Sequence, residues 1–476
     1  MSIAKQTAWL DATAQAELVR AGEVTALELT EAAIERAERL NPEINAIVTP
    51  LHDFARAAAK SPPQGPLSGV PFLLKDLGAE LGGTPMNHGS RFMDGYVSAE
   101  DSELTARFRR AGLIIFGKTN TPEFGLLPTT EPARFGPSRN PWDVSLSTGG
   151  SSGGSSAAVA AGIVAVAHAN DGGGSIRIPA SSCGLVGLKP TRGRNSLAPG
   201  SGDIGNGIVH EHVVCRTVRD SALVLDATHG PMPGDPYYPP APERPYTEEA
   251  TRDPGRLRIA ISDLPLTGAP VTDEVRAAVQ SVAKLCEDLG HDVVEAEPQI
   301  DRPRTLKAFG RVWVGLLGHT LAHLARSTGR ALNEADFEAG TWQMYRSSER
   351  LLAGDYLLAV EDLQAMARDV GAFFETVDVW LTPTLCRRPA PLGYFDFATG
   401  ERDEVIRRLG EYSGFTSLHN GTGHPAMSLP LQWTDDGLPL GVQIAGRYGD
   451  EATLFRLATQ LETARPWSGR RPAIAG

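Results

Sequence analysis

Cysteines and long apolar runs are both scarce in this chain. Only 4 cysteines occur in 476 residues, with no CxxC pair, so a disulfide scaffold is excluded and we expect reduced thiols in the core. No apolar run reaches the roughly 18 residues that a membrane helix needs. The first 24 residues carry scattered charges where a signal peptide has an apolar stretch. These absences predict a cytoplasmic protein with no membrane partner.

Positive charge is also in deficit. The chain has 45 Lys and Arg against 57 Asp and Glu, a net charge of −12, which argues against a broad surface for nucleic acid. The local basic pair Arg192 and Arg194 is too small to change this. His210 and His212 flank Glu211, but no further ligand follows at a recognisable spacing. We therefore expect no metal site.

No Pro/Ser-rich linker and no internal repeat divides the chain, which instead alternates helical and strand patterns. Apolar spacing predicts helices at residues 10–20, 25–41, 104–111, 156–162, 273–289, 361–377 and 451–464. Short apolar runs predict strands at residues 113–116, 163–169, 291–295, 379–381 and 440–444. This alternation implies a layered α/β fold.

The most informative segment is GGSSGGSSAAVAAGIVAVAHANDGGGSIRIP, residues 149–179. It frames two serines with glycines, Ser151 and Ser175, which lie 24 positions apart. Glycines let backbone N–H groups approach a ligand, so a nucleophilic Ser175 could have its oxyanion hole in the same turn. The candidate oxyanion donors are the N–H groups of Gly172, Gly173, Gly174 and Ser175. The alternative is a tight glycine turn with an incidental serine.

Three further polar residues surround that turn. We expect Asp171 and Arg177 to form an ion pair that fixes its shape, rather than two independently satisfied charges. Ser152 is a candidate, like Ser151, for the N-cap of the next helix. His168 lies in an apolar run and is more typical of a satisfied core histidine than of a catalytic base.

A lysine is the better candidate for a base. Lys75 follows the apolar run VPFLL, which predicts that it is carried inward. Burial lowers the pKa of a lysine, and only the neutral amine can take up a proton. The alternative is a surface lysine paired with Asp76, which is the commoner fate of a Lys-Asp dipeptide and which the residues alone favour.

Residues 149–180 resemble the amidase signature. The match rests on the GGSSGG block, the small residues 157–162, and Asp171, Gly173 to Ser175, Arg177 and Pro179. Similar segments follow the family order at residues 117–125, 183–194, 381–384, 423–430 and 436–444. The resemblance implies one domain over residues 1–476, an α/β/α sandwich around a large mixed sheet. It makes the Pro-rich residues 231–245 a surface excursion and residues 230–350 a more variable pocket region.

The same resemblance implies a serine hydrolase that cleaves amide C–N bonds through an acyl-enzyme. Ser175 would be the nucleophile, Lys75 the base, and Ser151, after a cis peptide bond from Gly150, the relay. The implied substrates are small amides of the nylon-oligomer or urethane type: apolar linear or cyclic secondary amides, aryl amides or carbamates. A homodimer is plausible, and no cofactor is implied. The candidate pocket residues are Gly125, Leu126, Leu127 and Trp313, with Trp342 and Tyr345 as further walls or ordinary core.

The sequence departs from the family pattern at one place and matches other motifs. ANDG stands at residues 169–172 where many amidases have a Gly-Thr-Asp-Thr-like string. GLIIFGKT, residues 112–119, matches a P-loop, but its middle residues read as a buried strand. GGSSG matches the elbow of a Ser-His-Asp esterase with His419 or His424 as base, but residues 141–148 are a poor strand before it. The third alternative is the glutaminase subunit of a tRNA-dependent amidotransferase.

Overall fold

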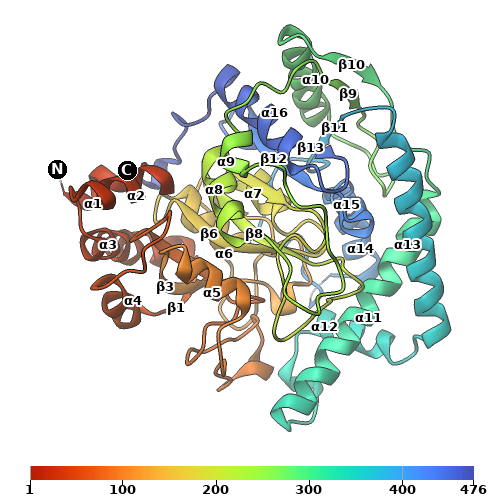
Figure 1. The fold of residues 1–476 in the computed structure, drawn as a ribbon. Coiled ribbons are helices and arrows are strands. Elements are labelled where there is room, and N and C mark those ends of the chain that lie inside the picture. The colour runs from red at the N-terminus through yellow and green to blue at the C-terminus, as the bar shows by residue number, and fades with distance from the viewer. Residues whose placement is uncertain (1, 399, 476) are drawn as a thin grey trace.

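The computed structural model describes residues 2–398 and 400–475, and one mixed sheet runs through its centre (Figure 1). Its strands lie in the order β1-β3-β2-β6-β8-β7-β12-β13-β11-β9-β10. They are β1 (Ile47–Pro50), β2 (Pro71–Lys75), β3 (Ile114–Thr119), β6 (Val166–Asp171), β7 (Val186–Lys189), β8 (His210–Cys215), β9 (Arg258–Ile261), β10 (Asp292–Glu295), β11 (Val379–Pro383), β12 (Ala426–Trp433) and β13 (Pro439–Gly446). β2 is parallel to β3 and β6, whereas β8 is antiparallel to β6 and β7.

Helices cover both faces of this sheet. They are α1 (Ile3–Thr7), α2 (Ala12–Ala21), α3 (Ala26–Ile44), α4 (His52–Ala59), α5 (Glu103–Arg110), α6 (Gly153–Ala160), α7 (Arg177–Cys183), α8 (Val218–Thr228), α9 (Tyr246–Glu249), α10 (Asp273–Asp288), α11 (Arg302–Thr328), α12 (Ala339–Ser348), α13 (Ala353–Phe374), α14 (Arg402–Tyr412), α15 (Ser417–Thr422) and α16 (Glu451–Ala464). Successive strand residues point to opposite faces, so Phe72 and Leu74 join a core with α2, α5, α8, α10 and α16. Leu73 joins the other core, with α3, α6 and α7. The predicted α/β/α layering is confirmed.

The predicted elements are all present, and their limits differ where the pattern was weak. The helix predicted at 451–464 is α16, which has those bounds. The helix predicted at 361–377 is α13, which already begins at Ala353. The helix predicted from residue 156 begins at Gly153, because small buried residues there carry no amphipathic signal.

One local prediction is wrong. Residues 141–148, expected to be a poor strand, contain β5 (Asp143–Ser147), which pairs antiparallel with β4 (Arg139–Asn140). These two strands form a sheet separate from the large one. The segment lacks the continuous apolar run of a buried strand because β5 is only partly covered.

Three other features of the chain concern its cysteines, its Pro-rich segment and its helices. The four cysteines are free thiols and are buried. Residues 231–245 form no helix or strand, and most of their side chains are exposed or half-buried. None of the described helices combines the length and hydrophobicity that crossing a bilayer requires.

Gly154 in α6 gives a test of how tightly the layers pack. A Cβ at this position would lie 2.5 Å from the backbone nitrogen of Asn120 and 2.7 Å from the carbonyl oxygen of Ala46. We expect Gly154→Ala to lower stability by about 1–3 kcal/mol because the backbone cannot give way. Gly371→Ala, in α13 with no atom within 4 Å, is the matched control and should raise stability by about 0.4–1 kcal/mol. Thermal unfolding of both variants checks this, and a stabilised Gly154→Ala would contradict the packing.

Candidate active site

Lys75 ends β2 in the interior, as the family resemblance implied. Its side chain is fully buried, and Nζ lies 2.6 Å from Ser151 Oγ and 2.5 Å from Asn170 Oδ1. Burial lowers the pKa of Lys75 to about 7, although the charges of Glu211 and Asp171 act in the opposite direction. The alternative of a surface lysine paired with Asp76 is wrong, since Asp76 is itself buried. An amine in this state can take up a proton near neutral pH.

Ser151 precedes α6 and follows the expected cis peptide bond from Gly150. A Cβ on Gly150 would lie 2.4 Å from the carbonyl oxygen of Thr129, so the chain can pass there only with glycine. The alternative interpretation of the two serines, as side-chain N-caps of α6, is wrong for both. Ser152 stands at the N-cap position of α6 but makes no side-chain cap bond. Its hydroxyl instead donates to the carbonyl oxygen of Asn170 at 3.2 Å, and this hydrogen bond links the start of α6 to β6.

The glycine turn after β6 presents Ser175 and open backbone donors. Within the described residues, the Ser175 hydroxyl has no hydrogen-bond partner, and its residue is 7% exposed. The N–H groups of Gly172, Gly173 and Ser175 also lack a protein acceptor among the described residues. Gly174 differs from the prediction, because its N–H donates to Asp171 Oδ1 at 2.7 Å and so is not free for a ligand. Three of the four predicted oxyanion donors therefore remain open.

A buried ion pair fixes that turn. Arg177 Nε and Nη2 donate to the two oxygens of Asp171 at 2.9 and 3.0 Å, and both side chains are fully buried. Burial alone would raise the pKa of Asp171, but the Arg177 charge and hydrogen bonds hold it well below its usual range. The expected pairing is confirmed.

Two residues that the sequence analysis missed complete the support of the turn. Asn420 donates to Asp171 Oδ1 at 2.8 Å and accepts from Arg177 Nη2 at 2.7 Å. Thr416 Oγ1 donates to the Gly173 carbonyl at 2.6 Å. A Cβ on Gly174 would lie 2.3 Å from the same Thr416 Oγ1, so only glycine fits there. Both lie over 230 positions from the turn in the sequence, so only the fold brings them there.

The predicted pocket residues lie around these serines to different degrees. Gly125 is next to Ser151, since a Cβ on it would be 3.2 Å from Ser151 Oγ. Trp313 of α11 lies against the turn, since a Cβ on Gly172 would be 3.0 Å from its ring. Leu126 packs in an apolar cluster with Phe92, Phe124, Leu317 and Tyr345, and Leu127 is half-buried. Trp342 stacks on Phe337, so it belongs to the aromatic packing around that cluster.

The competing motifs do not form the sites that they suggested. The middle of the P-loop-like segment is β3, a fully buried strand without a phosphate-binding loop. His419 packs against Trp380 and His424 against Phe374. Burial lowers the pKa of His424 to about 3, so that imidazole stays neutral.

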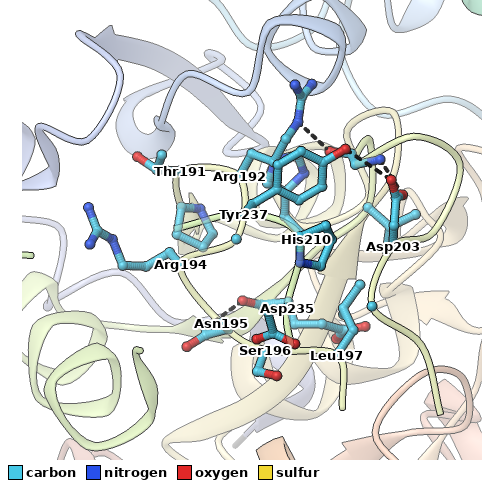
Figure 2. A pocket seen from close by; sticks show the side chains of 17 residues that line it. Thr191, Arg192, Arg194, Asn195, Ser196, Leu197, Asp203, His210, Asp235 and Tyr237 are labelled. Carbon is cyan, nitrogen blue, oxygen red and sulfur yellow. Dashed lines mark hydrogen bonds between the residues drawn. The ribbon is translucent and has the colours of Figure 1, made fainter. Parts of the chain in front are cut away.

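A small hollow lies beside the start of β8. Figure 2 shows Arg192, Asp203, His210 and Tyr237 around it, with the Tyr237 hydroxyl donating to Asp203 at 2.9 Å. His210 bonds through Nδ1 to the Ile208 carbonyl at 2.9 Å. No group of three or more His, Cys, Asp or Glu side chains is placed to hold a metal ion in the part of the chain that the structure describes.

The arrangement as a whole is that of a hydrolase. A buried amine contacts one serine hydroxyl, a second serine lies in a glycine turn, and neighbouring backbone N–H groups are open to a developing oxyanion. These are the parts that acyl transfer needs. They lie on one large mixed sheet with helices on both faces.

Comparison with known proteins identifies the family. The family model named Amidase matches residues 28–455. A 6-aminohexanoate-cyclic-dimer hydrolase of Paenarthrobacter ureafaciens is 41% identical over 489 aligned residues, covering 99% of this chain and 98% of that protein. A solved structure of 6-aminohexanoate cyclic dimer hydrolase has a TM-score of 0.93 at 40% identity, covering 98% of this chain and 99% of that one.

A second solved structure, of a bacterial aryl acylamidase, has a TM-score of 0.90 at 27% identity and covers 99% of both chains. The chain belongs to the amidase signature family and is an amide-hydrolysing enzyme.

Removing the arginine of the buried pair tests the support of the turn. We expect Arg177→Leu to destabilise the protein by about 3–5 kcal/mol, because it leaves the Asp171 carboxylate buried and unpaired. Arg276→Leu is the control, because its bond to Asp263 joins side chains that are 47% and 41% exposed. That substitution should change stability by less than about 1 kcal/mol. Equal effects on thermal unfolding would contradict the assigned role.

Proposed function

We propose that the chain hydrolyses amides with Ser175 as nucleophile, Lys75 as base and Ser151 as the proton relay between them. The observation that carries the proposal is the 2.6 Å contact between Lys75 Nζ and Ser151 Oγ in a fully buried site. A lysine with a pKa of about 7 is neutral often enough to serve as a base at physiological pH.

The acylation step follows from this arrangement. Lys75 takes the proton of the Ser151 hydroxyl, and Ser151 takes the proton of Ser175 as Ser175 Oγ bonds to the amide carbon. The charge that develops on the carbonyl oxygen is met by the open N–H groups of Gly172, Gly173 and Ser175. Ser151 then gives a proton to the leaving nitrogen and recovers one from protonated Lys75, and the C–N bond breaks. The amine leaves, and the acyl group stays on Ser175 as an ester.

Deacylation uses the same relay, with water in place of Ser175 as the attacking group and Ser175 in place of the amine as the leaving group. A water molecule gives a proton to Ser151, which passes its own proton to Lys75, and the water oxygen bonds to the ester carbon. The bond between Ser175 Oγ and that carbon then breaks. Ser151 gives a proton to Ser175 Oγ and recovers one from Lys75, and the carboxylic acid departs. One relay thus serves both halves of the reaction, which is why its three groups must be held close together.

The substrates that we propose are small, apolar, linear or cyclic secondary amides, with aryl amides and carbamates as further candidates. The relatives named above act on a cyclic amide dimer and on aryl acylamides, according to their names. Trp313 and Phe309, stacked with ring centroids 5.9 Å apart, lie against the Gly172–Gly173 turn. Such an aromatic wall favours an apolar acyl chain beside the reacting carbonyl.

Ser175→Ala should abolish turnover across a panel of a nitroanilide, a linear aliphatic amide, a cyclic amide dimer, an aryl carbamate and glutamine. It should also abolish covalent labelling by a fluorophosphonate, because no other hydroxyl replaces the nucleophile. The isolated wild-type chain should hydrolyse at least one apolar amide in preference to glutamine. Glutamine as the best substrate, or no turnover by the folded wild type, would favour the alternative of an amidotransferase subunit. Full labelling of Ser175→Ala would contradict the assignment of Ser175 as the nucleophile.

The base predicts a pH dependence with a definite sign. Because only neutral Lys75 accepts a proton and its pKa lies near 7, kcat/KM should rise with pH through about 7 and level off above it. Lys75→Ala should lose this rise and about 10²–10⁴-fold in kcat, the usual contribution of a general base. The measurement is kcat/KM between pH 5 and 9 for both proteins, with folding checked by circular dichroism. A Lys75→Ala variant with the wild-type profile would mean that another base acts.

A further inference from the structure

Three buried side chains connect the two ends of Lys75 in a closed ring of hydrogen bonds. The backbone N–H of Lys75 donates to His168 Nδ1 at 3.2 Å, and His168 Nε2 lies 2.6 Å from Glu211 Oε2. Asn170 Nδ2 donates to Glu211 Oε1 at 3.3 Å, and Lys75 Nζ donates to Asn170 Oδ1 at 2.5 Å. Asn170, His168 and Glu211 are each at most 6% exposed. The proposed function uses none of them.

The backbone donor at one end fixes the proton positions around the whole ring. Because His168 Nδ1 accepts the Lys75 N–H, the ring proton sits on Nε2, and Nε2 donates to Glu211. Asn170 Nδ2 then has two acceptors, Glu211 Oε1 and the Leu77 carbonyl at 2.9 Å. The amide oxygen of Asn170 is left facing Lys75 Nζ, with no freedom to flip.

The fold holds this ring rigidly. Asn170 and Glu211 are partners in the register of β6 and β8, and Lys75 ends the adjacent strand β2. Gly78 leaves the space that the ring occupies, since a Cβ there would lie 2.6 Å from Asn170 Nδ2 and 2.7 Å from Glu211 Oε1. A site built on paired strands keeps its geometry more closely than one built on loops.

A neutral amine has two N–H bonds and one lone pair, and only the lone pair can take the proton of Ser151. The Asn170 amide oxygen accepts hydrogen bonds and donates none, so it holds an N–H of the amine. We propose that Asn170, kept in place by Glu211 and His168, is a positioning residue that turns the lone pair of Lys75 toward Ser151, and that the Glu211 charge controls the pH range in which Lys75 acts. This inference rests on the proposed role of Lys75 as the base.

Among the charged groups around Lys75, Glu211 is the one that we expect to control the pH range in which Lys75 acts. Two carboxylates, Glu211 and Asp171, raise the pKa of Lys75 against the effect of burial. Asp171 is paired with Arg177, whereas Glu211 has no Lys or Arg ion-pair partner among the described residues. His168, the other ionisable side chain on the ring, accepts the backbone N–H of Lys75 at Nδ1. Removing the Glu211 charge should therefore favour the neutral amine.

The first arm of the test is the pH profile of Glu211→Gln. We expect the rise of kcat/KM to move to lower pH by about one unit, since a nearby opposite charge shifts a pKa by that order. Glu249→Gln is the matched control, because Glu249 is equally buried but bonds to Arg244 and Arg456 instead of the ring. It should leave the profile in place. A merely structural role for Glu211 would lower activity without moving the profile.

The second arm compares Asn170→Thr with Asn170→Val, two side chains of the same shape that differ in one hydroxyl. Threonine keeps an oxygen acceptor for the amine, so we expect its kcat to exceed that of the valine variant at least about tenfold, with similar KM values. Equal kcat values, or an unmoved profile in folded Glu211→Gln, would overturn the inference. Lys75→Ala, measured in parallel, separates the two claims: if that variant keeps the pH-dependent rise, the proposed function itself fails.

Discussion

The burial of a single amine is the constraint on which the rest of this site depends. A charged lysine inside a protein is strongly disfavoured, so Lys75 is poised between its two protonation states near neutral pH. The groups around Lys75 determine the balance between these two protonation states. The apolar strand β2 carries it inward, Ser151 and Asn170 receive its hydrogen bonds, and the Glu211 carboxylate limits how far its proton affinity falls. Burial strongly disfavours an ammonium group that has no hydrogen-bond partner. The acceptors around Lys75 are therefore held in place by contacts of their own.

The glycine turn after β6 meets a second requirement, which is to leave backbone N–H groups open beside Ser175, the proposed nucleophile. Open donors in a buried turn are rare, because the chain normally satisfies them. Here the Asp171–Arg177 pair, Asn420 and Thr416 hold the turn and use the N–H of Gly174. The N–H groups of Gly172, Gly173 and Ser175 keep no protein acceptor among the described residues. The support therefore comes from charged, amide and hydroxyl groups, and the ring of Trp313 lies against Gly172.

Local sequence patterns predicted much of this arrangement. Most of the remaining features depend on contacts between residues far apart in the sequence, so they could not be predicted. The run before Lys75, the glycines around Ser175 and the Asp171–Arg177 pair were all recognisable within short segments. The commitment of the Gly174 N–H to Asp171 was not, because it depends on the exact turn geometry. Asn170 was visible only as a departure from the family pattern, and Glu211 only as a residue between two histidines. Their meaning comes from the pairing of β6 with β8, which no local pattern reveals.

The central claim is that Ser175 carries the acyl group, and trapping that intermediate tests it most directly. The enzyme would be mixed with an activated anilide, quenched in acid within milliseconds, and digested, and the modified residue located by fragment mass spectrometry. The account predicts the mass of the acyl group on Ser175 at a level that matches the burst of released aniline. An acyl group on Ser151, or a burst of aniline with no acylated residue, would contradict it.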